Sequence, residues 1–392
     1  MIGVPMLNCS DGGLELRAGD RMLRFPAVWL RDNCPCSECV DPGSGQKLKD
    51  ITDVPNGVVV SAAEDAGESV VVTYAPDRHQ SVFTRSWLAA HALESRDGGD
   101  GRTEDDKELW LPADLAPATG RRPEESWPRY LAESAARART LDAVLRLGFA
   151  LLHDVPAEAG RVLGVAASFG FVRETNYGQL FDVRIEPRPG NLAYTCRQIL
   201  PHTDNPYRDP VPTIQLLHCL RAADDGGETG LVDGFAAATA LRAADAPTFE
   251  LLARTPVPFG YTDNGTDLRA SQPLIQLDPR GRVRAVRFNH RSTRPLRLPY
   301  AEIAAFYAAY LAWAELLARP ERRLNLRLAP GDCLIFDNTR ILHARTAFGG
   351  SGGRHLQGCY ADLDGLASTL AVLRRGLEQA RPVASADCNH GL

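Results

Sequence analysis

The chain has 392 residues, a net charge of -5 and a pI of about 6.0. This length suggests two domains, and the acidic balance argues against a protein that binds nucleic acid through a basic surface. We find no apolar run as long as a membrane helix and no signal peptide, so we expect a cytoplasmic protein that binds no membrane. The nine cysteines are an odd number, and in a reducing compartment we expect thiols or metal ligands.

The N-terminal part, residues 1–94, alternates short apolar runs with turns. Segments such as GVVVSAAED and SVVVTYAP carry apolar residues at every second position, which predicts strands. Residues 95–109 are rich in glycine and charge and contain few apolar side chains, which indicates a solvated linker. We therefore predict a small β domain, a linker and a larger domain over residues 110–392.

The larger domain mixes helices with many short strands. The spacing of apolar residues predicts helices over residues 127–147, 299–318 and from 363 to 377. Strand candidates lie at 149–156, 191–195, 213–220, 230–235, 282–289, 324–338 and 355–363. Short strands with helices packed outside them favour a mixed α/β, mainly β fold, a double-stranded β-helix or jelly roll.

Two histidines and one carboxylate form a candidate iron site. His202 and Asp204 stand two residues apart in LPHTDNPY, so on an extended strand both side chains face the same way. His343, in ILHART, would arrive from another strand. Two imidazoles and a carboxylate on one face of a metal leave positions open, as in non-haem Fe(II) oxygenases. Each histidine alone is more often a core or surface residue, and the interpretation depends on the ordered set.

A candidate co-substrate site accompanies these ligands. Arg354 follows His343 by eleven residues and offers a planar fork that binds a carboxylate in a bidentate manner. A 2-oxo acid that chelates the iron would present its far carboxylate to this arginine, and the hydroxyl of Thr229 could join it. The alternative for Arg354 is a surface ion pair.

A cluster of cysteines near the N-terminus predicts a second metal site. Cys34, Cys36 and Cys39 stand in WLRDNCPCSECVDP and need one more ligand for a tetrahedral zinc. His79, at the end of the next β segment, is the best candidate. Such a closed site would be structural and would stabilise a small domain. The alternative is a set of reduced thiols or a redox pair.

The chain resembles the γ-butyrobetaine dioxygenases and the related trimethyllysine and 2-trimethylammonioethylphosphonate hydroxylases, within the taurine dioxygenase superfamily. The resemblance covers nearly the whole chain, from WLRDNCPCSEC in the small domain to HTD, VDGF, FDNTRILHAR and RHLQGCYAD in the large one. It implies a homodimer, Fe(II) on His202, Asp204 and His343, and zinc on the three cysteines and His79. It also implies 2-oxoglutarate bound by Arg354, Thr229 and the strand of Leu217.

The resemblance further implies hydroxylation with O2, in which 2-oxoglutarate is converted to succinate and CO2. Family substrates carry a trimethylammonium group, which aromatic faces bind. The positions that match the family's aromatic cage are Tyr177, Phe181, Tyr194 and Tyr360, and Asp182 adds a negative charge beside the cation. Arg197, Asn289 and Arg291 are the candidates for the anionic end of the substrate.

Several alternatives stay open at this point. Extra arginines suit the dianionic phosphonate better than the carboxylate of γ-butyrobetaine, but arginines more often face solvent. Each aromatic residue alone is more often part of a core than of a cage. The oxygenase could act on trimethyllysine, a sulfonate or an amino acid instead. A jelly-roll protein that binds a betaine without catalysis is the remaining alternative.

Overall fold

The computed structural model describes residues 7–92, 102–185, 195–263, 265–349 and 353–380. The chain divides into two compact units, Met1–Gly99 and Asp100–Leu392.

The N-terminal unit is built from two three-stranded antiparallel sheets. One sheet holds β1 (Leu7–Ser10), β2 (Gly13–Ala18) and β3 (Arg21–Phe25), and the other holds β4 (Val59–Ala66), β5 (Ser69–Ala75) and β6 (Gln80–Thr84). The short helices α1 (Ala27–Asp32) and α2 (Arg85–Ala90) complete the unit. Every second residue of β5 is buried, as the alternating pattern predicted. Leu14, Leu30, Val70 and Leu88 meet in the small core.

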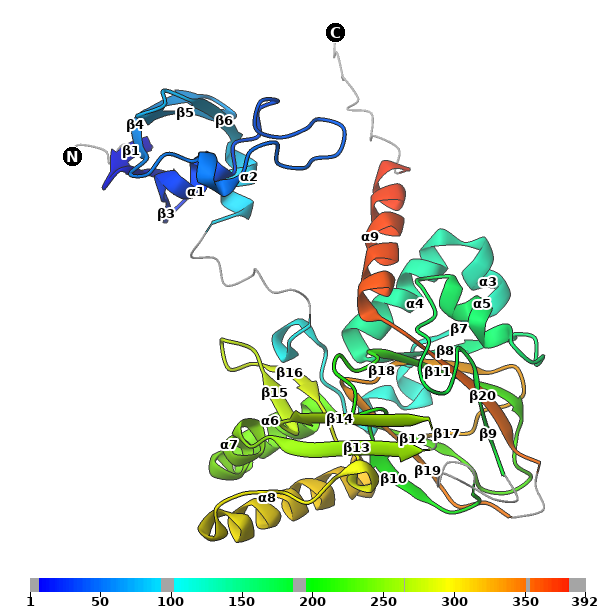
Figure 1. The fold of residues 1–392 in the computed structure, drawn as a ribbon. Coiled ribbons are helices and arrows are strands. Elements are labelled where there is room, and N and C mark those ends of the chain that lie inside the picture. Colours follow the sequence, from blue (N-terminus) through cyan, green and yellow to red (C-terminus); the bar gives the residue numbers. More distant parts are fainter. Residues whose placement is uncertain (1–6, 93–101, 186–194, 264, 350–352, 381–392) are drawn as a thin grey trace. The chain divides into compact units, whose positions relative to one another are not determined.

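Two facing sheets form the centre of the larger unit, so the predicted jelly roll is confirmed (Figure 1). The six-stranded sheet has the order β7 (Glu124–Ser126), β8 (Phe149–His153), β18 (Cys333–Asp337), β11 (Ile214–Arg221), β20 (His355–Ala361) and β9 (Phe181–Arg184). The four-stranded sheet has the order β10 (Ile199–His202), β19 (Ile341–Arg345), β12 (Thr229–Asp233) and β17 (Leu324–Leu326). Leu231 and Ile341 of one sheet pack on Leu334 and Phe336 of the other.

Helices cover the outer faces of this core. Against the six-stranded sheet pack α3 (Trp127–Ala132), α4 (Ser134–Leu147), α5 (Arg161–Ala167) and α9 (Leu363–Gln379). The single helix that we predicted over 127–147 is thus two helices, because Glu133 takes an extended conformation between them. The leucines of the C-terminal helix pack toward the sheet, with Leu366 and Leu370 buried as their spacing predicted.

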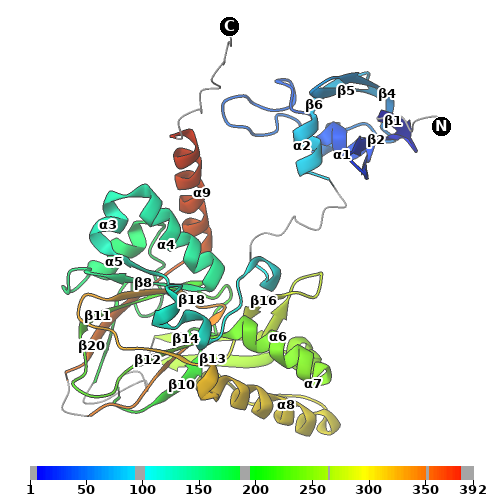
Figure 2. The same ribbon diagram turned by 180° about the vertical axis from the view of Figure 1, so that it is seen from behind.

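An insertion between β12 and β17 forms a second core. It contains α6 (Gly234–Ala244), α7 (Ala246–Arg254) and α8 (Tyr300–Ala318). It also contains the hairpins β13 (Val257–Asp263) with β14 (Thr266–Gln272) and β15 (Ile275–Leu277) with β16 (Val283–Val286). The helices α6, α7 and α8 lie side by side (Figure 2). Phe249, Phe306 and Trp313 pack at the centre of this core. The β13–β14 hairpin was not predicted, and its residues Gly260, Tyr261 and Thr262 line a cavity of the larger unit.

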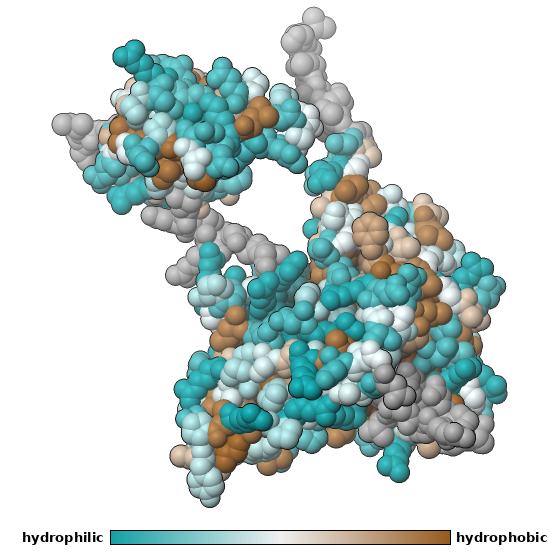
Figure 3. Space-filling view, viewed as in Figure 1, coloured by the Kyte–Doolittle hydropathy of each residue, from teal (hydrophilic) through white to brown (hydrophobic). Residues whose placement is uncertain are grey.

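The helix α8 meets the length and composition of a membrane span, contrary to our reading that no apolar run was long enough. One face of α8, with Phe306 and Trp313, is buried in the protein. Its exposed face carries Glu302 and Glu315. Hydrophilic and hydrophobic residues are mixed over the face of the molecule that Figure 3 shows. The exposed face also carries Tyr300, Tyr307 and Leu311, and 33% of the apolar stretch is buried, so α8 packs on the insertion with one face and leaves the other exposed.

The segment between the β domain and the jelly roll was predicted as a linker over residues 95–109. Within it, residues Glu104–Asp106 form a 3-10 helix. The Glu104 carboxylate accepts hydrogen bonds from Thr239 and Arg242 of α6, and Lys107 donates to the carbonyl of Leu145. Residues 104–107 are therefore attached to the larger unit.

A buried ion pair lies where the chain leaves the jelly roll for the insertion, between the end of β12 and the residue before β19. The guanidinium of Arg340 donates from Nε and Nη2 to the two carboxylate oxygens of Asp233, at 3.0 and 2.7 Å, and both side chains are almost fully buried. Asp233 also accepts from the backbone N–H groups of Phe235 and Ala236, which caps α6, and from the N–H of Trp110. The one carboxylate of Asp233 therefore accepts all five of these hydrogen bonds.

We predict that Asp233→Ala lowers the free energy of unfolding of the larger unit by about 3–5 kcal/mol, because it leaves the Arg340 charge buried and unpaired. Denaturant unfolding followed by tryptophan fluorescence measures this loss. Asp142→Ala, which removes an exposed ion pair with Arg374, is the control and should change stability little. Equal losses in the two variants would contradict the assignment.

Candidate active site and metal centres

The register between β10 and β19 brings two histidines together. His202 and His343 are opposite each other in this antiparallel pair, and their ring centroids are 4.1 Å apart. The Asp204 carboxylate lies beside both rings, with Oδ1 3.5 Å from His202 Nε2 and Oδ2 3.9 Å from His343 Nε2. One ligand atom of each residue falls within 4.8 Å of the others. The three predicted iron ligands therefore converge on one point.

Asp204 reaches this point from a turn and not from the strand that we predicted. The strand β10 ends at His202, and Asn205 takes a left-handed conformation with a φ of 54°. The buried side chain of Asn338 fixes the turn. Its Oδ1 accepts from the N–H of Asp204 at 2.7 Å, and its Nδ2 donates to the carbonyls of Asp204 and Pro212 at 3.0 Å.

The protonation states of His343 and Asp204 suit metal binding. Burial and, to a smaller extent, the neighbouring His202 lower the pKa of His343 to about 3. Burial opposes ionisation of Asp204, but His343 and His202 hold the pKa of its carboxyl well below the usual range. The Nδ1 of His202 faces the carbonyl of Leu200 at 2.9 Å, which leaves Nε2 free for a metal. Neutral imidazoles and a carboxylate are the forms that bind iron.

The ligands lie on the wall of a cavity of about 410 Å³. Of the predicted site residues, those on its wall are His202, Asp204, His343, Leu217, Thr229, Arg354, Tyr177, Phe181, Tyr360, Asn289 and Arg291. Tyr194 lies outside the described residues. Asp182 and Arg197 do not line the cavity.

Asp182 and Arg197 point elsewhere for simple reasons. In β9 the side chains of Phe181 and Val183 face the cavity, so Asp182 between them faces the opposite side of the sheet. There its carboxylate accepts from His355 at 2.6 Å and from Gln357 at 3.0 Å. The side chain of Arg197 is exposed, and its carbonyl accepts a hydrogen bond from Arg345.

Aromatic rings gather on one side of the cavity. Tyr177 contacts Phe181 and Tyr261 at centroid distances of 6.2 and 5.8 Å, and Tyr207 stacks on Tyr261 at 5.1 Å. Phe181 stacks on Tyr360 at 5.1 Å. We call these five residues the aromatic box. The phenyl ring of Phe181 fits because residue 358 is glycine, where a Cβ would lie 2.4 Å from its Cζ.

Sequence reasoning missed Tyr207 and Tyr261. Tyr207 stands three residues after Asp204 in HTDNPY, and this closeness to a metal ligand was a usable signal. Its hydroxyl is 2.9 Å from that of Tyr177. Tyr261 comes from the unpredicted β13–β14 hairpin, and nothing in its local sequence marked it.

Arg354 is a buried cation that faces the cavity. Burial lowers its pKa to about 10, and the described residues give its guanidinium no carboxylate partner. Gly227 has a φ of 69°, and a Cβ there would lie 3.1 Å from Arg354 Cδ, so glycine allows this close packing. A buried guanidinium that lines the same cavity as the hydroxyl of Thr229 fits the far carboxylate of 2-oxoglutarate.

A second group of polar side chains lines the cavity near Asn289. The Nδ2 of Asn289 donates to the carbonyl of Thr203 at 3.2 Å, while its buried Oδ1 has no partner among the described residues. Arg291 and Arg294 also line the cavity. Arg294 was not predicted. Asp204 is the only acidic residue among the described residues on the wall, so the cavity favours anions.

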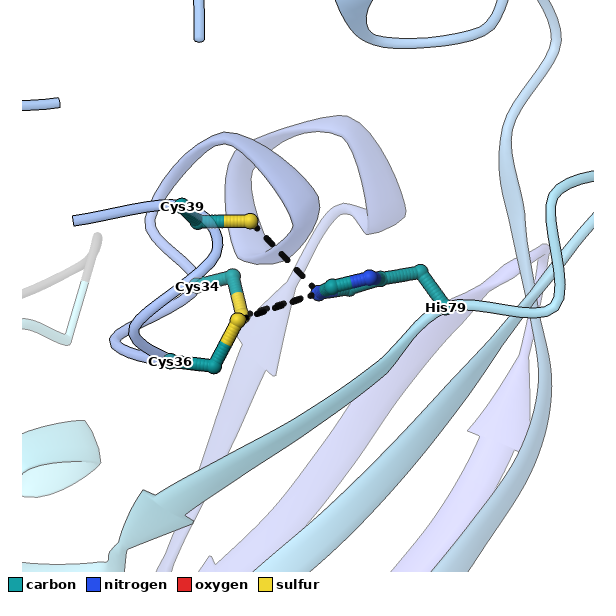
Figure 4. Close-up of side chains that lie close together, drawn as sticks. All are labelled: Cys34, Cys36, Cys39 and His79. Carbon is teal, nitrogen blue, oxygen red and sulfur yellow. Dashed lines mark hydrogen bonds between the residues drawn. The ribbon is translucent and has the colours of Figure 1, made fainter. Parts of the chain in front are cut away.

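The cysteine cluster in the N-terminal unit has the geometry of a zinc site (Figure 4). The Nε2 atom of His79 lies 3.1, 3.7 and 3.6 Å from the sulfur atoms of Cys34, Cys36 and Cys39. Zinc–sulfur bonds of about 2.3 Å and a zinc–nitrogen bond of about 2.0 Å would place these atoms about 3.5 Å apart in a tetrahedron. The four residues therefore fit zinc.

Arg31 supports this site. Its Nε donates to Asp77 at 2.9 Å and its Nη1 to the sulfur of Cys39 at 3.5 Å. Three thiolates around a divalent zinc leave a net negative charge, and the buried guanidinium balances it. Burial lowers the pKa of His79, which keeps its ring neutral and able to bind a metal.

Comparison with known families agrees with this geometry. Residues 113–360 match the sequence model of the taurine catabolism dioxygenase TauD, TfdA family. Residues 8–89 match that of the gamma-butyrobetaine hydroxylase-like N-terminal domain.

Curated relatives extend over most of the chain. A gamma-butyrobetaine dioxygenase of Pseudomonas sp. (strain AK-1) is 35% identical, covering 91% of this chain and 92% of that protein. The human gamma-butyrobetaine dioxygenase is 31% identical, covering 90% and 92%. A trimethyllysine dioxygenase of Meyerozyma guilliermondii is 31% identical, covering 91% and 92%.

For the cysteine site we predict that Cys36→Ser releases roughly one zinc ion per chain and destabilises the N-terminal unit, because a closed zinc site contributes directly to folding. Metal analysis of the purified protein measures both metals. Iron binding should be largely retained. An equal loss of zinc and iron would show that the two sites are not separate.

Proposed function

The chain belongs to the taurine catabolism dioxygenase TauD, TfdA family and is a 2-oxoglutarate-dependent iron dioxygenase, and we propose that it hydroxylates a small trimethylammonium zwitterion. The observation that carries the proposal is the aromatic box beside His202, Asp204 and His343.

The cofactors have residues that fit them. Iron would be held by His202, Asp204 and His343, and when bound it supplies the oxidation of an unactivated C–H bond by O2, with 2-oxoglutarate converted to succinate and CO2. Arg354 and Thr229 orient the co-substrate through its far carboxylate, and Leu217 forms an apolar wall beside it.

The aromatic box supports a quaternary ammonium group at one end of the substrate. Such a cation has no N–H to donate, so aromatic faces bind it better than hydrogen-bond acceptors do. The hydroxyl pair between Tyr177 and Tyr207 holds two of the rings in place. The relatives compared above are named for γ-butyrobetaine and trimethyllysine, and both of these molecules carry such a cation.

The side chains of Asn289, Arg291 and Arg294 support an anionic group at the end of the substrate opposite the trimethylammonium group. γ-Butyrobetaine, with a carboxylate, and 2-(trimethylammonio)ethylphosphonate, with a dianion, both have this charge pattern. Trimethyllysine also carries an α-ammonium group, which needs acceptors. Among the described residues that line the cavity, the one carboxylate is Asp204, which the iron would occupy. This argues against trimethyllysine.

We predict that Arg354→Met raises the dissociation constant of 2-oxoglutarate at least about 30-fold. Loss of a charge-assisted pair in a buried site costs about 2–5 kcal/mol. Anaerobic titration of the iron-loaded protein measures this constant. Arg197→Met changes an exposed arginine outside the cavity and should leave the constant as it is. Unchanged binding in Arg354→Met would remove this residue from the co-substrate site.

The cation can be tested with a neutral isostere. We predict that γ-butyrobetaine binds at least about 10-fold more tightly than 5,5-dimethylhexanoate, in which carbon replaces nitrogen, because each ring contributes about 0.5–2 kcal/mol to a cation. Competition for substrate-stimulated succinate release measures the difference. Tyr261→Leu should reduce this difference in affinity between the cation and its neutral isostere. Equal affinities, or no succinate with either betaine, would overturn the proposed substrate class.

The same assay separates the two anions. If the parent protein prefers the phosphonate and Arg291→Gln loses this preference, Arg291 binds the dianionic phosphonate group. Preference for γ-butyrobetaine with little effect of that substitution would favour the carboxylate.

A further inference from the structure

One carboxylate oxygen of Asp204 already accepts hydrogen bonds from other side chains of the protein. Its Oδ2 accepts a hydrogen bond from Gln215 Nε2 at 2.8 Å and one from the Tyr360 hydroxyl at 3.1 Å. The amide of Gln215 must present nitrogen here, because an oxygen would repel the carboxylate. Oδ1 receives no such donor from the described residues and is the oxygen left for iron.

The two donors come from the sheet that faces Asp204. Gln215 on β11 and Tyr360 on β20 are register partners in the six-stranded sheet, and both are almost fully buried. Asp204 follows β10 of the other sheet. The donors therefore cannot follow Asp204 if its turn shifts, and they define one orientation of the carboxylate.

Tyr360 is also a wall of the aromatic box. Its ring stacks on Phe181 with an interplanar angle of 30°, and it lines the cavity together with Tyr177 and Tyr261. Tyr177, in contrast, directs its hydroxyl to Tyr207. Among the described residues of the box, the hydroxyl of Tyr360 is the one that reaches an iron ligand.

We propose that Gln215 and Tyr360 are positioning residues that keep Asp204 a one-oxygen ligand of the iron, and that Tyr360 transmits occupancy of the aromatic box to that ligand. A carboxylate can bind a metal through one oxygen or through both. With Oδ2 held away by two donors, Asp204 takes one coordination position, and the positions that 2-oxoglutarate and O2 need stay open.

The second half of this inference rests on the proposed function, because it places the substrate cation against the Tyr360 ring. The first half concerns iron and the protein alone. Measurements without substrate and with substrate therefore separate a failure of this inference from a failure of the proposed substrate class.

The experiment compares Tyr360→Phe and Gln215→Met with the parent protein, and Tyr177→Phe is the matched control. Tyr360→Phe keeps the ring and removes the hydroxyl that reaches Asp204, and Tyr177→Phe removes a hydroxyl of the same box that does not. Thermal unfolding of each metal-free variant shows that it is folded. The first readout is the Fe(II) dissociation constant from anaerobic titration against a competing chelator.

Loss of a group that orients a metal ligand costs about 10–100-fold in metal affinity or activity. We expect Tyr360→Phe and Gln215→Met each to raise the Fe(II) dissociation constant about 10-fold, with Tyr177→Phe like the parent. A parental constant in Tyr360→Phe, or an equal rise in Tyr177→Phe, would overturn the positioning role.

The second readout is the visible absorption of the complex of Fe(II) and 2-oxoglutarate before and after γ-butyrobetaine is added. We expect the substrate-induced change to be smaller in Tyr360→Phe than in Gln215→Met and the parent, and the ratio of succinate to hydroxylated product to rise in Tyr360→Phe. A full change with a parental ratio would overturn the transmission by Tyr360. If no betaine altered the absorption of the parent, the proposed substrate class would fail while the Fe(II) constants still tested the positioning role.

Discussion

The active site depends on the side-chain amide of Asn338. This residue follows β18 in the six-stranded sheet, and it hydrogen-bonds both backbone groups of Asp204, which follows β10 in the other sheet. A turn that leaves a strand has free N–H and C=O groups, and a buried turn needs partners for them. Because one amide supplies these partners, the turn has one conformation, and the carboxylate of Asp204 lies between His202 and His343.

Three parts of the fold contribute the residues that line the cavity. The four-stranded sheet supplies the histidines and Thr229. The six-stranded sheet supplies Phe181 and Tyr360, and Arg354 stands directly before its strand β20. The insertion supplies Tyr261 and the group around Asn289. The metal and co-substrate residues thus stand on or beside the rigid core, while the substrate residues come in part from loops and a hairpin. Chains with the same core can differ in substrate through the insertion alone.

The metal ligands and the co-substrate arginine could be predicted from the sequence better than the residues that line the rest of the cavity. Ligands such as His202 and His343 were recognisable because metal chemistry restricts residue types and order, and Arg354 because it follows at a set distance. Tyr261 could not be predicted, since its contribution depends on how the β13–β14 hairpin folds over the cavity. Asp182 was misplaced for a related reason: the period of two along β9 determines its direction, and β9 itself was not predicted. The split of residues 127–147 into two helices was likewise not predicted, and it follows from the extended backbone of the exposed residue Glu133.

The connection between β18 and β19 has a further consequence for how the enzyme acquires its metal. This connection carries Asn338, which holds the turn of Asp204, and Arg340, which is fully buried against Asp233. His343 follows three residues later in β19. Segments with such burial are the last to open in native-state hydrogen exchange. These ligands therefore lose their conformational entropy when the jelly roll folds, and the binding of iron does not have to order them.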